Sequence, residues 1–295
     1  MGSTVERPPV QGLPGATAVL RVGYDGTGFS GYAIQEKQPH VRTVAGELRT
    51  ALRMLLRRDV ELTCAGRTDA GVHARAQHVS FAVDGREALE LDGGRLLRSL
   101  GAILPEDVRV DRVFRAPEGF SARFDATARH YRYGVSVGPV EPLFGARWTW
   151  WQRSASPWEV DVEAMAAGAR HLEGEHDFKS FCKTASAVDK PTSRFVEHVR
   201  LEWEEAYGER RLVFDVVGNA FLHSMVRTIV GTLMEVGCGR REPDWVAEVL
   251  SACDRRAAGP CAPAKGLTFW DVRYPDGVLR PWEAAYQLGG TMGFL

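Results

Sequence analysis

Residues 64–74 read CAGRTDAGVHA, and the patterns on either side of this stretch predict a loop between two strands. Residues 60–64 and residues 78–83 both alternate apolar and polar side chains, which is typical of half-buried strands. Within the loop, two glycines bracket Arg67 and Asp69 and allow the tight turns that such a connection needs. A surface ion pair between these two residues is the ordinary interpretation. The alternative is a functional loop, because binding and catalytic residues gather on loops that rigid strands position.

The length and composition of the chain indicate a globular protein with room for two domains. It has 295 residues, of which 44% are hydrophobic and 25% are charged. It contains no run of about 18 apolar residues, so a membrane span is not expected. Residues 1–16 are rich in proline and glycine and lack an apolar signal core, so we expect a disordered leader there.

The cysteines and histidines indicate neither a disulfide framework nor a metal site. The five cysteines are scattered and no two are spaced as C-x-x-C, which fits a protein of the reducing cytoplasm. His171 and His176 have no further ligand at metal-binding spacing. The chain also lacks a dinucleotide-binding or P-loop motif.

The net charge of −1 argues against a protein that binds nucleic acid through its overall charge. The charges are unevenly divided, however. Residues 1–150 carry 20 Lys and Arg against 17 Asp and Glu, and residues 151–295 carry 17 against 21. Of the 37 basic residues 32 are arginine, which binds phosphate through two hydrogen bonds and stacks on bases. The sequence is therefore compatible with a basic patch confined to one cleft.

Hydrophobic periodicity predicts strands and helices in both halves of the chain. Further strands are expected at residues 18–24, 108–114, 129–137, 195–203, 212–217 and 267–274. Helices are expected after the capping residues Thr43 and Asp161, and at residues 96–104, 221–236 and 243–252. This mixture predicts an α+β fold with domains at residues 17–145 and 146–274. Residues 275–295 form a tail to which the patterns assign no structure.

Two residues outside the loop at residues 64–74, the central loop, are candidates for a functional site. Each also has an ordinary structural explanation. Tyr131 shares one face of a strand with Tyr133, and two such tyrosines are equally well explained as part of the core. Arg227 lies inside an apolar helix, where a charge needs either a partner or a route to water. A side chain that reaches out of the helix to solvent is the alternative for this arginine.

The central loop also has a recognisable sequence. Its run GRTDAGVHA at residues 66–74, followed by Gln77, resembles the signature of the TruA family of tRNA pseudouridine synthases. Three more blocks, at residues 24–35, 120–133 and 219–227, resemble the family's motifs in the expected order. The chain departs from the family pattern at three positions, where Tyr32 replaces Trp, Ala33 replaces Gln and Ser121 replaces His.

This resemblance implies a fold and a reaction. The fold is that of the pseudouridine synthases, with two similar α/β halves of mainly antiparallel strands that meet at a central cleft. The reaction isomerises uridine to pseudouridine without a cofactor or metal, with Asp69 as nucleophile or base. Tyr131 would stack on the uracil and could help to transfer a proton, and Arg227 would pair with Asp69. Arg67 would support the flipped base from within the loop.

The resemblance also implies the partners. The substrate would be tRNA, modified in the anticodon stem-loop at positions of the 38–40 type. Tyr24, Asp25, Gln35 and His73 are expected to lie at the RNA. The family forms homodimers, so a dimer is expected. Two alternatives stay open: the same isomerisation on another RNA or a small nucleoside, and an RNA-binding module without activity.

Overall fold

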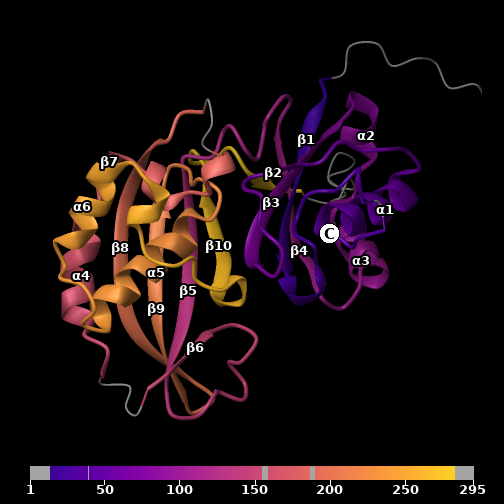
Figure 1. The fold of residues 1–295 in the computed structure, drawn as a ribbon. Helices are drawn as coiled ribbons and strands as arrows, with labels where there is room; N and C mark the ends of the chain where they lie inside the picture. The colour runs from indigo at the N-terminus through magenta and orange to yellow at the C-terminus, as the bar shows by residue number, and fades with distance from the viewer. Residues whose placement is uncertain (1–13, 39, 155–158, 187–189, 283–295) are drawn as a thin grey trace, which may run out of the picture.

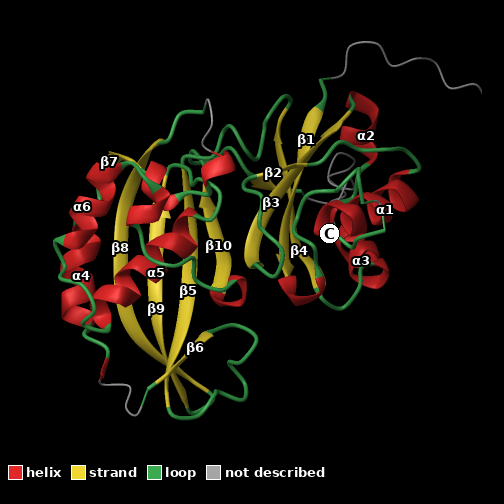
Figure 2. Cartoon of the chain, in the orientation of Figure 1, coloured by secondary structure: helices red, strands yellow, loops and turns green. Residues whose placement is uncertain are grey.

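The computed structural model describes residues 14–38, 40–154, 159–186 and 190–282, and one large sheet runs through the molecule (Figure 1, Figure 2). Its strands are hydrogen-bonded in the order β11-β4-β1-β3-β10-β5-β9-β8-β7, with β2 beside β3 and β6 beside β5. Among the pairs in this part of the chain, β3–β10 and β5–β6 are parallel and the others antiparallel. The predicted α+β class with mainly antiparallel strands is therefore confirmed.

The elements of the first half of the chain lie together, at the right of Figure 1. The strands are β1 (Ala16–Tyr24), β2 (Thr63–Cys64), β3 (His73–Val83) and β4 (Val108–Pro117), and the helices are α1 (Val44–Leu56), α2 (Gly85–Glu90) and α3 (Gly93–Ile103). Thr43 caps α1 as expected, because its side chain accepts a hydrogen bond from the Gly46 amide. The predicted apolar stripe of this helix is buried at Val44, Leu48 and Leu52.

The second group lies at the left of Figure 1. Its strands are β5 (Ala128–Gly138), β6 (Trp150–Arg153), β7 (Gly174–Asp177), β8 (Ser193–Ala206), β9 (Glu209–Gly218) and β10 (Leu267–Arg273). Its helices are α4 (Val162–Arg170), α5 (Met225–Gly237) and α6 (Trp245–Ala252), of which α4 packs on β8 and α5 on β5. Short 3₁₀ turns occur at Gly26–Gly28, Lys179–Phe181, Thr184–Ser186, Arg255–Ala257 and Ala264–Gly266.

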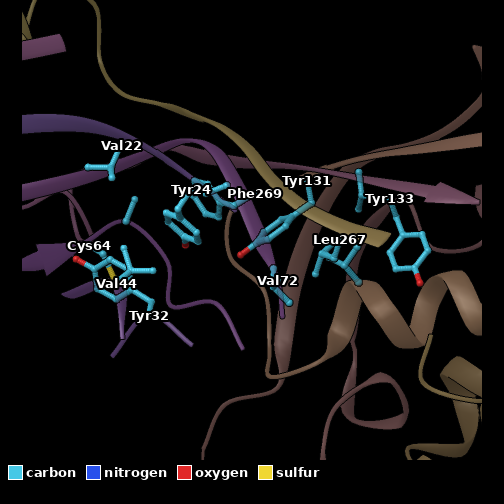
Figure 3. Close-up of a cluster of buried hydrophobic side chains, with 14 of the residues drawn as sticks. Val22, Tyr24, Tyr32, Val44, Cys64, Val72, Tyr131, Tyr133, Leu267 and Phe269 are labelled. Atoms are coloured by element: carbon cyan, nitrogen blue, oxygen red, sulfur yellow. The ribbon is translucent and has the colours of Figure 1, made fainter. Parts of the chain in front are cut away.

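Strand β10 joins the two groups, because it pairs with β3 on one side and β5 on the other. Its Phe269 is fully buried, and the ring lies edge-on to Tyr131 with centroids 5.0 Å apart. Figure 3 shows Tyr131 and Phe269 in one buried cluster with Tyr24 and Val72. The pairing of β10 therefore brings the central loop next to β5, although the two lie about sixty residues apart in the sequence.

Several predicted boundaries are wrong. The helix expected at residues 221–236 begins only at Met225, because Ser224 adopts a left-handed backbone conformation with φ 63° that a helix cannot contain. The strand expected at residues 60–64 is reduced to the two residues of β2. Helix α3 begins earlier than expected, because the Asp92 side chain caps it by accepting from the Arg95 amide. Helix α2 was not predicted at all.

The tail left unassigned by the sequence contributes to the sheet edge. Arg280 and Pro281 form β11, which pairs with β4, and the indole of Trp282 is buried and donates to the Leu91 carbonyl. Of the expected leader, residues 1–13 lie outside the described residues, and Ala16 already belongs to β1. The domain boundary near residue 145 stays a prediction. No helix within the described ranges is long and apolar enough to cross a membrane.

Candidate active site

Buried hydrogen bonds fix the central loop from the side of the sheet. Gln77 of β3 donates to the Gly66 carbonyl at 2.6 Å and accepts from the Gly66 amide at 3.3 Å. The hydroxyl of Tyr24 lies 2.7 Å from Thr68 Oγ1, and both residues are buried. Burial raises the pKa of Tyr24, so this phenol stays protonated. A side chain at Gly66 would approach Phe269 within 2.9 Å, so this position requires glycine.

His73 connects the loop to three distant segments. Its Nδ1 accepts a hydrogen bond from the Gly26 amide at 3.0 Å, and its Nε2 lies 3.0 and 3.2 Å from the carbonyl oxygens of Arg147 and Lys265. These partners require a neutral ring with the proton on Nε2, and burial lowers its pKa in the same direction. The 3.2 Å contact of Nδ1 with Asp25 Oδ1 is therefore not a charged pair.

A cavity of about 2090 Å³ opens on the other side of the loop. Its wall includes the loop, the first turns of α1, Tyr131 of β5 and residues 220–227. It is lined by four acidic residues and by nine basic ones, namely Arg42, Arg49, Arg67, Arg123, Arg129, Lys183, Lys190, Arg194 and Arg227. The positive charge is local, since the whole chain carries −1. A wall of this kind suits a phosphate backbone.

Asp69 lies in the wall of this cavity with its side chain 34% exposed. Its Oδ2 is 3.5 Å from Nη1 of Arg227 and accepts from the Ser224 hydroxyl at 3.4 Å, and its Oδ1 is 3.2 Å from Nε2 of His223. Arg227 is itself oriented, because its Nε donates to the Ala262 carbonyl at 2.7 Å. The carboxylate thus has three polar neighbours at long distances and still faces open space.

Tyr131 lines the same cavity as this carboxylate and lies in an apolar setting. Its ring is edge-on to Phe221 and Phe269, with centroids 5.1 and 5.0 Å away. Burial raises the pKa of Tyr131, so its hydroxyl is protonated at neutral pH. The ring lines the cavity, and its hydroxyl lies close to Gly66 of the loop. A flat base that entered here would meet an aromatic surface next to a carboxylate.

The structure brings together five of the eight predicted site residues. Asp69, Tyr131, Arg227, Arg67 and Gln35 line the cavity. Tyr24, Asp25 and His73 do not line it: Tyr24 and His73 point into the contacts behind the loop, and Asp25 accepts from the Thr27 amide. Among the residues that the structure describes, no cluster of His, Cys, Asp and Glu is arranged to hold a metal ion.

Two residues that contact Asp69 were missed by the sequence analysis. His223 and Ser224 belong to the block at residues 219–227, but that block drew attention only to Arg227. The contact depends on the left-handed backbone of Ser224, which turns the chain just before α5. The presence of a histidine in that block was the one feature of the sequence that could have indicated the contact with Asp69.

Comparison with known proteins finds one family. A family model described as tRNA pseudouridine synthase matches residues 169–275. A tRNA pseudouridine synthase A from Brevibacillus brevis is 41% identical over 254 residues, which is 86% of this chain and 97% of the relative. Its counterpart from Chloroflexus aurantiacus is 40% identical over 275 residues, which is 93% of this chain and 95% of the relative. A third, from Thermotoga neapolitana, is 39% identical over 253 residues, with coverages of 86% and 97%.

The fold, the carboxylate in its cavity and these matches define a pseudouridine synthase. Because relatives 39–41% identical align over nearly their whole length, the chain belongs to the tRNA pseudouridine synthase A family.

Proposed function

We propose that this protein isomerises uridine to pseudouridine in tRNA, with the carboxylate of Asp69 as the reacting group. The observation that carries the proposal is an accessible carboxylate, 3.5 Å from a guanidinium, in a cavity whose charged lining residues are mainly basic. The names of the relatives supply the substrate class. Local positive charge supports it, because binding of a nucleic acid backbone depends on such contacts.

The chemistry needs few groups. The bond between N1 of uracil and C1′ of ribose breaks, the base turns, and a bond forms between C5 and C1′. C5 loses one proton and N1 gains one, so the reaction involves no net oxidation or reduction. Asp69 acts on the nucleotide as nucleophile or base, and Arg227 compensates its charge when the bound RNA excludes water.

The target uridine must first leave its stack, which costs a few kcal/mol. In the proposal, Tyr131 stacks on the flipped uracil, a contact worth roughly 1–3 kcal/mol, so the two terms are of similar size. Arg67, exposed in the cavity wall, supports the RNA where the base has left. Gln35 contacts the RNA from the same wall. Tyr24 and His73 act through the loop that they fix, and Asp25 acts by capping the turn at Gly26–Gly28.

We infer from the family resemblance that the target lies in the anticodon arm, at positions of the 38–40 type. A homodimer in the cytoplasm is the inferred active form on the same basis. On the same basis we assign the two similar halves on either side of the cavity to residues 17–145 and 146–274.

The experiment is to incubate the purified protein with three substrates and to measure pseudouridine in each. The substrates are a whole tRNA, its isolated anticodon stem-loop and uridine monophosphate. We expect fast conversion of the whole tRNA, slower conversion of the stem-loop and none of the nucleotide. Conversion of free nucleotide at a comparable rate would identify a small-molecule enzyme instead. No pseudouridine in any of the three substrates would contradict the proposal and leave another RNA substrate or an RNA-binding module without activity.

A further inference from the structure

We propose that His223 is a positioning residue that fixes the orientation of the Asp69 carboxylate. The inference rests on the proposed function, since it assigns a role beside the reacting group. Its Nε2 lies 3.2 Å from Oδ1 of Asp69, whereas Arg227 and Ser224 both contact Oδ2. The two carboxylate oxygens therefore have different partners, all of them within residues 223–227.

This division matters because a carboxylate rotates easily about the bond that joins it to Cβ. Contacts to one oxygen restrict that rotation, and a further contact to the second oxygen narrows the range of carboxylate planes that remains. His223 contributes a polar contact to Oδ1 of Asp69, through its Nε2. The productive alignment of a nucleophile or base is sensitive to such rotation, since a misplacement of about 1 Å can reduce a rate about 100-fold.

The backbone around His223 holds the side chain in place. The carbonyl of His223 accepts a hydrogen bond from the Lys183 amide at 3.1 Å. At the start of the segment, Asn219 accepts at its backbone carbonyl from Arg129 at 2.6 Å and at its side chain from the Phe195 amide at 3.1 Å. The segment is thus fixed at both ends, which limits where the imidazole can go.

Ser224 supplies an independent observation. It is one of four non-glycine residues with positive φ in the described chain, and its left-handed conformation separates His223 from the first turn of α5. Such conformations carry a cost and persist where the surrounding structure requires them, often at functional sites. Here the turn lets residue 223 and residue 227 approach the same carboxylate from two directions.

A positioning role needs only a hydrogen-bond donor at Nε2. Both the neutral ring with its proton on Nε2 and the charged ring provide one. The amide nitrogen of glutamine can occupy nearly the same place but cannot carry a proton to or from the substrate. Replacement by glutamine and replacement by leucine therefore separate positioning from proton transfer.

The test measures kcat and KM for tRNA in His223→Gln and His223→Leu alongside the unaltered protein. We expect His223→Leu to lower kcat about 10- to 100-fold with KM changed less than about 3-fold, because the reacting group and not the RNA is misplaced. We expect His223→Gln to recover kcat to within about 5-fold, with an unchanged pH profile. Because this side chain is 39% exposed, both variants should fold, which the melting temperature checks.

Two results would overturn the inference. Normal kcat in His223→Leu would mean that Oδ1 needs no fixed partner. A His223→Gln variant as slow as His223→Leu would mean that the histidine transfers a proton. Failure of the proposed function gives a different result, because the unaltered protein would then form no pseudouridine.

Discussion

Asp69 and Asp215 are bound by the same kinds of side chain, yet only one of them faces a cavity. Asp215 of β9 contacts His130 at 2.7 Å, His198 at 2.9 Å and Arg132 at 3.6 Å. Its side chain is 19% exposed, against 34% for Asp69. The partners of Asp69 lie farther away, at 3.2 to 3.5 Å.

Strand alternation separates the two aspartates. Asp215 is opposite Arg132 on β5. Tyr131, which precedes Arg132 on the same strand, is opposite Val216 and lines the cavity. Successive side chains of a strand point to opposite faces, so Asp215 lies on the face away from the cavity. A carboxylate with histidine and arginine partners is therefore not a site in itself. Space for a ligand and longer distances to its polar partners distinguish Asp69 from Asp215, and three substitutions test this difference.

Of these three substitutions, Arg227→Gln should have the largest effect. Loss of the guanidinium beside Asp69 leaves its charge uncompensated in a site that RNA closes, which should lower kcat about 100- to 1000-fold. The measurement is the single-turnover rate of pseudouridine formation on tRNA. The matched control is Arg132→Gln beside Asp215, which should change that rate less than about 2-fold. Equal losses in both variants would remove the distinction between the two aspartates.

The next effect concerns stability and pH. Burial opposes the charge of Asp215, but hydrogen bonds from His130 and His198 outweigh it and lower the pKa of Asp215 from 3.8 to about 2. Because this pKa is lower in the folded state, the stabilisation is present above pH 4 and is lost as the pH falls toward 2. Asp215→Asn should therefore reduce the free energy of unfolding by about 2 kcal/mol at pH 7 and by progressively less below pH 4.

Urea denaturation of Asp215→Asn and the unaltered protein between pH 3 and pH 7 tests this expectation. The variant should keep its kcat, since Asp215 lies away from the cavity. A difference in stability that grows on acidification would contradict the assignment.

The smallest effect is expected for Ser224→Gly. Glycine adopts the left-handed conformation at little cost, so the variant should gain up to about 1 kcal/mol of stability. It loses only a 3.4 Å hydrogen bond to Asp69, and kcat should fall less than about 3-fold. Thermal denaturation and a steady-state assay give both numbers. A destabilised variant would show that the serine side chain matters more than the strained backbone.

The sequence predicts the part of the site that short-range patterns and motifs encode. The loop between β2 and β3 follows from alternation and glycines, and the motif blocks point to Asp69, Tyr131 and Arg227. The α+β class follows from the same periodicity. These features depend on residues that are near one another in the sequence.

The features that the sequence did not predict depend on long-range register or on backbone dihedral angles. The cluster around Asp215 requires the pairing of β5, β9 and β8, which no local pattern specifies. The contact of His223 with Asp69 requires a positive φ at a serine, a residue that gives no such signal. The inward orientation of Tyr24 and His73 depends on partners far away in the chain, such as Lys265.

The most direct test of the account is the Asp69→Asn variant, measured for both catalysis and tRNA binding. Asparagine keeps the size of the side chain and removes the negative charge, so we expect pseudouridine formation to fall at least about 1000-fold. The dissociation constant for tRNA should stay within about 3-fold, because the basic wall of the cavity is unchanged. A variant that still modifies tRNA at a rate within 10-fold of the unaltered protein would contradict the assignment of Asp69 as the reacting group.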